Sequence, residues 1–293
     1  MNITLKQLSV FTTTARLSGI TKAAQALSMT QSAASQSLKE LENILGHPLF
    51  TRFGRKLVIN DHGQALLSKA TQMLALQTQI QHPSTTQLQG ELKVAASVTI
   101  GSYVMPQLLA KFIALHPQVE PKLIINNSEQ VTNKLMTGQV HIGLIEAPIA
   151  HQSLHLSPWR TDQLAIFCAS DHRLAKQKKL NLKEMSQQRW ILREHGSGTR
   201  SVFVNAMQQQ GGVIKHSMDL ARQEAIKQAV KANLGLGVLS VLSIQQELSL
   251  GVFKLLATPL NLNRQLSVIQ SEHYRYDPLV NAFYAFLQEN EVQ

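Results

Sequence analysis

The apolar positions between residues 20 and 45 predict two short helices joined by a tight turn over 27–30. Small residues in the first helix let another helix cross it closely. The second helix has an apolar stripe at helical spacing, formed by Ala34, Leu38, Leu41 and Leu45. Thr21 and Thr30 are expected to cap the two helices, because a threonine hydroxyl accepts a hydrogen bond from a free amide at a helix start. The pattern predicts a helix-turn-helix.

Another side of the second helix is polar and almost free of acidic residues. After Gln31 at its start, it presents Ser32, Ser35, Gln36 and Lys39. Such side chains can approach base edges, and glutamine can pair with adenine through two hydrogen bonds in the major groove, where a helix-turn-helix inserts its second helix. We expect these residues, with Thr21 and Thr30, to form the DNA-contacting surface. An ordinary solvated helix face is the alternative.

Basic residues surround this motif. Residues 1–60 contain only two acidic residues, Glu40 and Glu42, against Lys6, Arg16, Lys22, Lys39, Arg52, Arg55 and Lys56. Segments 49–52 and 57–59 predict a hairpin whose Arg52, Arg55 and Lys56 contact phosphate or a minor groove. Such contacts set affinity and register rather than sequence choice. A charged hairpin tip without a partner is the alternative.

A long helix is predicted from Asp61 to Gln81, with Asn60 as its cap. Apolar and long side chains repeat in it at alternating steps of four and three: Leu66, Ala70, Met73, Gln77 and Ile80. That spacing favours pairing with a second copy, and helix-turn-helix proteins commonly bind DNA as dimers. Residues 82–87 have the composition of a hinge.

From residue 91 onward, strands alternate with helices, which predicts an α/β body of two lobes. Strands are expected at 92–96, 123–125 and 140–145, then at 164–168, 190–192, 213–218 and 236–239, with a returning strand at 264–270 and a closing helix at 277–289. The chain is expected to cross between lobes near Asp162 and Arg264. The predicted divisions are 1–60 for the DNA-binding domain, 61–90 for the linker helix and hinge, and 91–293 for the body, with lobe I at 91–162 and 265–293 and lobe II at 163–264.

Composition narrows the class of protein. The 293 residues are 44% hydrophobic and carry a formal net charge of +10, which suits a globular protein with a polyanionic partner. No apolar run approaches the length that spans a bilayer, and the N-terminus lacks the pattern of a leader, so we expect a cytoplasmic protein without a membrane partner. Cys168 is the only cysteine, in an apolar run where a buried thiol is expected.

The chain resembles the LysR-type transcriptional regulators. The resemblance rests on Ala23-Ala24, Leu27, Thr30-Gln31-Ser32-Ala33-Ala34-Ser35, Leu41-Glu42, Leu45-Gly46, Leu49-Phe50, Arg52 and Gly63. Ser32 replaces a common proline and Asn60 a common threonine, and both are good capping residues. The resemblance implies an N-terminal winged helix-turn-helix, a linker helix, and a two-lobed, periplasmic-binding-protein-like effector domain. It also implies duplex DNA as partner, a homodimer through the linker helix that assembles into a tetramer, and a small-molecule effector.

Segments 94–101, 143–148 and 192–200 resemble the family branch linked to sulfur-oxyanion assimilation, although His195 replaces the proline usual there. Ligands of doubly wound sheets bind beyond the carboxyl ends of strands. Ser97 and Thr99 lie there at one helix start, and Ser197, Gly198, Thr199 and Arg200 lie at another. Free amides and hydroxyls at two helix N-termini suit a small anion. A polar capping loop is the alternative.

Glu146 is expected at the same site, where a carboxylate would repel a bound anion. We therefore expect a ligand that retains a proton, such as hydrogen sulfite, or one that bears an amine, whereas sulfate should bind less well. Glu146 as a salt-bridge partner between lobes is the alternative.

The sequence argues against two other classes of function. His195, Ser197 and Glu146 could form a hydrolytic set, but the sequence has no Gly-x-Ser-x-Gly elbow and no His-Glu-x-x-His metal motif. A transport-type solute-binding protein would not begin with a basic helix-turn-helix. We expect neither catalysis nor a cofactor.

Overall fold

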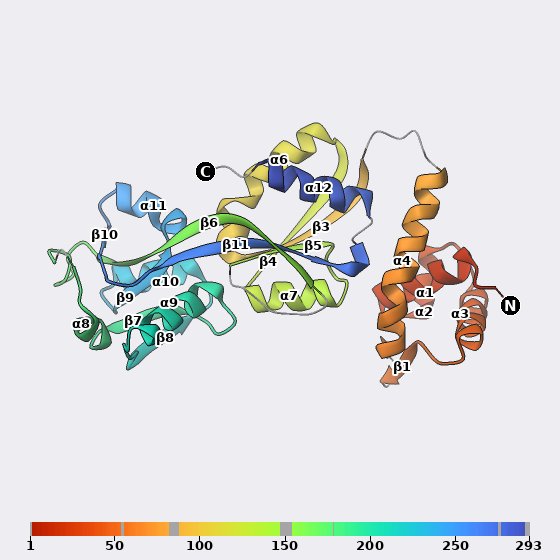
Figure 1. Cartoon of the computed structure of the whole chain (residues 1–293), viewed down its shortest axis with the longest axis horizontal. Coiled ribbons are helices and arrows are strands. Elements are labelled where there is room, and N and C mark those ends of the chain that lie inside the picture. The colour runs from red at the N-terminus through yellow and green to blue at the C-terminus, as the bar shows by residue number, and fades with distance from the viewer. Residues whose placement is uncertain are drawn as a thin grey trace.

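The computed structural model describes residues 2–53, 56–81, 88–146, 154–177, 179–274 and 277–290. Figure 1 shows a helical head beside an elongated α/β body. The head comprises α1 (Leu5–Leu17), α2 (Ile20–Ala26), α3 (Gln31–Leu45), β1 (Phe50–Phe53), β2 (Lys56–Ile59) and α4 (Asp61–Gln81). A single apolar core joins these elements, and its largest fully buried side chains are Leu8, Phe11, Leu41 and Leu49.

Three of the expected helix ends are confirmed. The Thr30 hydroxyl accepts a hydrogen bond from the Ala33 amide at 3.2 Å, so Thr30 caps α3. Gly46 ends α3 with φ +79°, a left-handed conformation that glycine adopts without strain. Asn60 Oδ1 accepts from the Gly63 amide at 2.9 Å and caps α4.

The expected cap of α2 is wrong. This helix begins at Ile20 with extended Gly19 as its N-cap, so Thr21 lies within the first turn. The chain reverses at Ser18, which has φ +51°, and therefore enters the helix earlier than the capping preference of threonine predicts. In the body, the helix that begins at Ser128 is capped by Asn127, whose side chain accepts from the Gln130 amide.

The wing is a two-stranded antiparallel hairpin in which Arg52 pairs with Leu57 and Phe53 with Lys56. Its tip, Gly54 and Arg55, and the predicted hinge at 82–87 lie outside the described residues. The first half of α4 packs on the head, where Ala70 is buried and Leu66 contacts the core. Farther along the helix Met73, Leu76 and Ile80 are exposed, Ile80 by 78%. The first part of the predicted heptad seam therefore packs in the head core, and its C-terminal part is exposed apolar surface.

Gly63 allows α4 to pack against the wing. A Cβ at this position would lie 2.3 Å from the Leu49 carbonyl oxygen and 2.5 Å from Ile59 Cγ1. We expect Gly63→Ala to destabilise the head by about 1–3 kcal/mol, the usual cost of overpacking, because a backbone carbonyl cannot move aside as a side chain can. Amide hydrogen exchange in α1 and α3 would measure this loss.

Gly19→Ala is the matched control for this change, because the nearest atom to its added Cβ is the Leu17 carbonyl oxygen at 3.9 Å. Equal exchange rates in the two variants would contradict the packing role of Gly63.

The strands of the body form one continuous order, in which the long strand β6 (Leu154–Ala169) runs through both lobes and pairs with β11 (Asn263–Ser271) in lobe I. In lobe I the strand order is β4-β3-β5-β11-β6, with β3 (Gln89–Ser97) parallel to β4 (Gln118–Asn126) and β5 (Ile142–Ile145). Helices α6 (Met105–Leu115) and α12 (Pro278–Glu289) cover one face, and α7 (Ser128–Met136) covers the other (Figure 1). The short α5 (Val98–Tyr103) follows β3 directly.

Lobe II continues from β6 with the order β6-β9-β7-β8, and β10 (Phe253–Leu255) also pairs with β6. Its remaining elements are α8 (Leu182–Ser186), β7 (Arg189–Arg193), α9 (Gly198–Gln209), β8 (His216–Leu220), α10 (Gln223–Lys231), β9 (Leu236–Ser240) and α11 (Val241–Ser249). A 3-10 turn, η1 (Glu272–Tyr274), follows β11. No helix within the described ranges is long and apolar enough to cross a membrane.

The two residues near which the chain is predicted to cross between the lobes lie next to each other. Asp162 on β6 and Arg264 on β11 are paired in antiparallel register where both strands pass from one lobe to the other. Both side chains are buried. The two crossings therefore place opposite charges together between the lobes, beside the ends of β3 and β5.

Candidate nucleic-acid interface and effector site

The exposed side of α3 has the composition that the sequence predicts for a DNA-reading surface. The predicted residues Gln31, Ser32, Ser35, Gln36 and Lys39 are all exposed, as is the acidic Glu40 next to them, whereas Ala34, Leu38 and Leu41 are buried against the head. Thr21 and Thr30 are also exposed. The apolar side therefore fixes the helix to the head and leaves the polar side open to a partner.

Glu40 organises part of this surface, a role that the sequence reasoning missed. Gln36 Nε2 donates to Glu40 Oε1 at 2.9 Å, and Gln7 Nε2 donates to Glu40 Oε2 at 3.3 Å. The spacing of four residues between Gln36 and Glu40 is the signal that could have found it, since side chains so spaced meet on a helix. The Gln36 amide is therefore oriented before any DNA is bound.

The structure describes the wing residues Arg52 and Lys56 as parts of β1 and β2, next to the hairpin tip. Arg55, the third basic residue predicted there, lies outside the described residues. The hairpin directly precedes α4 and packs through Leu57 and Ile59 on the same core as α3. The hairpin and α3 thus share one apolar core.

Glu146 lies at the centre of a buried polar cluster between the lobes. Its Oε1 accepts hydrogen bonds from Ser97 Oγ and the Thr99 amide, both at 2.8 Å. Its Oε2 accepts from Thr199 Oγ1 at 3.2 Å and from Arg264 Nη1 at 2.7 Å. The cluster therefore joins the end of β3, the end of β5, the start of α9 and the crossing strand β11.

Arg264 is the residue that sequence reasoning failed to place in the site. Besides Glu146 it binds Asp162, whose Oδ2 accepts from Arg264 Nε at 2.7 Å, and it donates to both threonine hydroxyls of the cluster. Burial raises the pKa of Glu146, but the Arg264 charge and the hydrogen bonds from Ser97 and Thr99 outweigh it and hold this pKa below its usual value. Glu146 is therefore ionised at neutral pH.

The charge of Glu146 is compensated in part by Arg264, with which it forms a salt bridge at 2.7 Å. The compensation is incomplete, because one guanidinium serves two carboxylates and the described triad has one positive and two negative charges. Ser240 Oγ donates to Asp162 Oδ1 at 2.7 Å, and Gln223 Nε2 donates to Thr99 Oγ1 at 3.0 Å. Neutral hydrogen-bond donors therefore help Arg264 to stabilise the two carboxylates.

Ser197 is the member of the set with unused hydrogen-bonding capacity. Its hydroxyl is buried and has no partner among the described residues, at the start of the twelve-residue helix α9. Gly198 permits the lobes to close here, because a Cβ on it would lie 2.9 Å from the Glu146 carbonyl carbon and Cβ. A buried hydroxyl without a partner is costly, which marks this point as one that a ligand can satisfy.

Arg200 does not join the cluster. Its guanidinium donates to the Arg193 carbonyl at 2.8 Å and to Asp219 Oδ1 at 2.6 Å, within lobe II. The physical reason is helical rotation, since each residue of a helix turns by about 100° and the second residue after Gly198 points away from the cleft. In this structure Arg200 is therefore engaged by Asp219 and the Arg193 carbonyl, and its contact with a ligand stays a prediction.

The lobes contact each other along one side of the cluster. Asn127 Nδ2 donates to Glu194 Oε1 at 3.2 Å, and the Glu129 amide donates to the Gly196 carbonyl at 3.3 Å. His195, by contrast, has an exposed side chain at 4.0 Å from Asp219. The hydrolytic set of His195, Ser197 and Glu146 is therefore not assembled. Among the described residues, no group of three or more His, Cys, Asp or Glu side chains could hold a metal ion.

Comparisons with known proteins agree with this architecture. Residues 5–64 match the model of the bacterial regulatory helix-turn-helix protein, lysR family, and residues 85–291 match the LysR substrate binding domain. The HTH-type transcriptional regulator YeiE of Escherichia coli (strain K12) is 34% identical over 287 residues, which cover 98% of this chain and 97% of that protein.

Two solved structures are similar in fold. Full-length OxyR from Pseudomonas aeruginosa superposes with a TM-score of 0.80 at 20% identity, covering 98% of this chain and 95% of that chain. The CcmR regulatory domain of Synechocystis, in complex with 2-PG, superposes with a TM-score of 0.63 at 25% identity and covers 69% of this chain and 97% of that domain.

Proposed function

Because this chain belongs to the LysR family of transcriptional regulators, we propose that α3 reads duplex DNA while the cluster around Glu146 and Ser197 holds the effector. The observation that carries the first part is the exposed side of α3, which presents hydroxyl, amide and ammonium groups within a firmly packed head. Lys39, with Arg52, Arg55 and Lys56 of the wing, would supply contacts to phosphate. Such a regulator acts where the chromosome is, in the cytoplasm.

Two copies would pair through the free apolar end of α4. Met73 and Ile80 of the heptad seam are exposed there together with Leu76, whereas Leu66 and Ala70 of the seam pack in the head core. A pair of heads would then address two half-sites on one face of the duplex. Further contacts between bodies would assemble the tetramer.

The effector would bind at the unpartnered Ser197 hydroxyl and the start of α9. The one net negative charge of the Glu146, Asp162 and Arg264 triad disfavours a fully deprotonated anion, whereas the amides at the helix start favour some negative charge. A small anion that retains a proton, such as hydrogen sulfite, or a ligand with an amine satisfies both conditions. The CcmR domain, which is similar in fold, holds 2-PG, which supports a small ligand here.

Ligand binding would act through the closure of the lobes. Thr199 and Gly198 of lobe II contact Glu146 of lobe I directly, so a ligand at Ser197 changes the free energy of this contact. A ligand that prefers one closure state shifts the population toward it, with coupling free energies of about 1–3 kcal/mol in typical cases. The heads would follow through the segment that joins α4 to β3.

Thermal unfolding of the full chain with sulfite, sulfate or O-acetylserine tests the effector class. We expect sulfite or O-acetylserine to raise the melting temperature more than sulfate does. Ser197→Ala should weaken that effect about fivefold in affinity, the value of one hydrogen bond near 1 kcal/mol. Ser249→Ala, which removes an exposed hydroxyl bonded only within α11, should leave it unchanged. Equal responses to all three ligands would contradict the proposal.

A further inference from the structure

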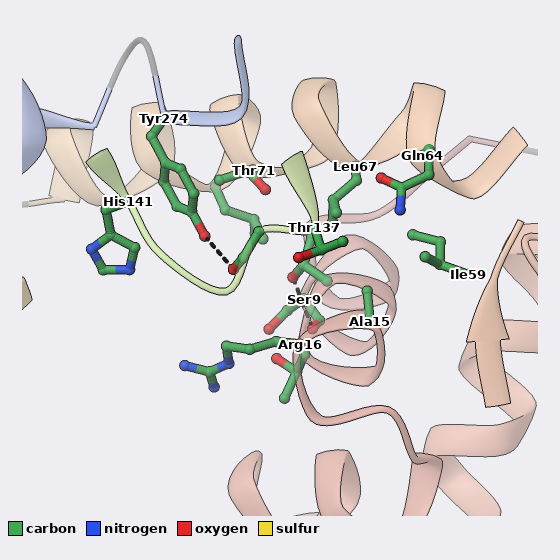
Figure 2. A pocket seen from close by; sticks show the side chains of 14 residues that line it. Ser9, Ala15, Arg16, Ile59, Gln64, Leu67, Thr71, Thr137, His141 and Tyr274 are labelled. Atoms are coloured by element: carbon green, nitrogen blue, oxygen red, sulfur yellow. Dashed lines mark hydrogen bonds between the residues drawn. The ribbon is translucent and has the colours of Figure 1, made fainter. Parts of the chain in front are cut away.

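A cavity of about 340 Å³ lies between the head and lobe I, far from the cleft described above. Figure 2 shows its walls, which come from α1 and α4 of the head and from two segments of the body. The body contributes Thr137 and Gly138 after α7, His141 before β5, and Tyr274 in η1. His141 and Glu146 lie at opposite ends of β5, about 15 Å apart at the usual rise of a strand. This cavity is therefore separate from the interlobe cluster.

One end of the cavity is cationic and rich in hydrogen-bond donors. Arg16, in the last turn of α1, points to the same side as His141 (Figure 2). His141 Nδ1 accepts a hydrogen bond from the Lys93 amide at 3.2 Å, so a neutral ring carries its proton on Nε2 and can donate it. Burial lowers the pKa of His141, which keeps the ring neutral near pH 7. Thr12 and Thr13 also line the cavity, and the Thr12 hydroxyl donates to the Ser9 carbonyl at 3.2 Å.

No carboxylate is among the residues that line the described cavity. The nearest acidic side chains that act on His141 are Asp277 and Glu91, and both are engaged elsewhere. Asp277 caps α12 by accepting from the Leu279 and Val280 amides at 2.9 and 3.0 Å. Glu91 pairs with Lys93 at 2.7 Å and with Lys122. The excess charge at this end is therefore positive.

The rest of the cavity is apolar. Leu67 and Leu74 of α4 face it together with Ala15 and Ile59. Tyr274 forms part of the wall with its ring tilted against that of His141, centroids 4.7 Å apart, and its hydroxyl donates to the Gly138 carbonyl at 3.3 Å. A ligand here would meet a cation at one end and ring or aliphatic surface along its length.

We propose that this cavity is a second effector site, which binds a small monocarboxylate with a ring-sized apolar body. The carboxylate pairs with Arg16 and accepts a hydrogen bond from His141 Nε2, and the apolar body lies between Leu67 and Tyr274. Because Arg16 and Leu67 belong to the head while His141 and Tyr274 belong to lobe I, the ligand bridges the two parts. Its binding fixes the angle between head and body and so changes duplex binding, and by linkage duplex binding changes its affinity in return.

The test measures the binding of benzoate and cyclohexanecarboxylate to the full chain by calorimetry without DNA, with neutral benzamide as the matched probe. We expect one carboxylate per chain, weaker binding of benzamide, and a loss of about tenfold in Arg16→Gln, since a hydrogen bond to a charged group is worth more than a neutral one. Arg16→Lys should restore part of the affinity. Arg189→Gln removes an exposed arginine on β7 and should change nothing.

Two further variants test whether the carboxylates bind in this cavity and not at the interlobe site. Thr12→Val alters the same wall without removing a charge and should weaken both carboxylates by a smaller factor. Ser197→Ala should leave their binding intact, which separates this site from the interlobe site and from the proposed function. If neither carboxylate binds the unaltered chain at millimolar concentration, or if both bind Arg16→Gln equally well, the cavity is not such a site.

Discussion

Replacement of Arg264 by methionine is expected to lower the free energy of unfolding of the body by about 3–5 kcal/mol, the usual cost of removing one partner from a buried ion pair. The change leaves Glu146 and Asp162 as two buried carboxylates without their cation. It also removes the donors that Arg264 provides to Thr99 and Thr199. Methionine has similar length and no charge, so the loss reflects charge rather than an empty cavity.

Urea unfolding followed by tryptophan fluorescence measures this loss in the body alone. The chain has two tryptophans, and both are buried in the body, Trp159 in lobe I and Trp190 in lobe II. Arg189→Met is the control, because Arg189 is exposed and surface substitutions usually change stability by less than about 0.5 kcal/mol. A loss in Arg264→Met no greater than that in Arg189→Met would show that the triad does not hold the lobes together.

The loss of stability in Arg264→Met should depend on pH, and the lowered pKa of Glu146 gives the direction. Glu146 has a pKa below its ordinary value of 4.5 in the folded chain, so its contribution to stability is fully present above about pH 4.5 and is lost as the pH falls through the folded pKa. Without Arg264 this contribution is absent, and burial then favours the protonated acid. The difference between the two chains should therefore be largest near neutral pH and shrink in acid.

A triple variant separates charge from shape. Arg264→Met combined with Glu146→Gln and Asp162→Asn removes all three charges and keeps the side-chain volumes similar. Replacement of a whole buried ion cluster is often neutral or stabilising, so we expect most of the lost stability to return. A triple variant as unstable as Arg264→Met would mean that the geometry of the guanidinium, rather than the balance of charge, maintains the structure.

Most elements of this fold follow from local patterns in the sequence. The boundaries of α4 and the caps Thr30, Gly46 and Asn60 were predictable, because capping depends on a residue and its near neighbours. Thr21 was not, since the start of α2 is set by the left-handed Ser18 rather than by the best capping side chain. Single-residue conformations of this kind have no periodic signal.

For the candidate effector site, the sequence predicts the residues at strand ends but not Arg264. Ser97, Thr99, Glu146 and Thr199 all follow or end strands, so the topology of a doubly wound sheet brings them together. Arg264 lies at the start of strand β11 and not at the carboxyl end of a strand, where a ligand site is expected. Only its antiparallel pairing with Asp162 places it in the cleft. Pairing across more than a hundred residues leaves no local trace.

Substitution of Ser35 by glutamate is expected to abolish specific duplex binding, a loss of at least about a thousandfold, which is the lower end of the margin between specific and non-specific complexes. Ser35 is exposed on α3 beside Gln36 and Lys39, and it makes no contact that holds the head together. Glutamate favours helix more than serine does, so the fold remains, while its charge meets the phosphates that line the groove. Fluorescence anisotropy with the chain's own promoter region measures the loss.

Gln245→Glu makes the same change of net charge on an exposed turn of α11 in the body, and it should leave duplex affinity nearly unchanged. Equal losses in the two variants would indicate a general effect of charge, and binding of Ser35→Glu at the affinity of the unaltered chain would remove α3 from the interface.

Gln36→Ala should act on choice of sequence rather than on affinity as a whole. The Gln36 amide nitrogen has two hydrogens, of which Glu40 Oε1 accepts one at 2.9 Å. The other hydrogen can be donated to N7 of adenine, and the amide oxygen can accept from its N6 amino group. Glu40 therefore holds the Gln36 side chain in an orientation that suits this pair of hydrogen bonds. Loss of this pair should cost about 1–3 kcal/mol at one base pair and nothing at the others. Glu40→Gln should weaken the same preference less, because it keeps an acceptor for the amide but not its charge.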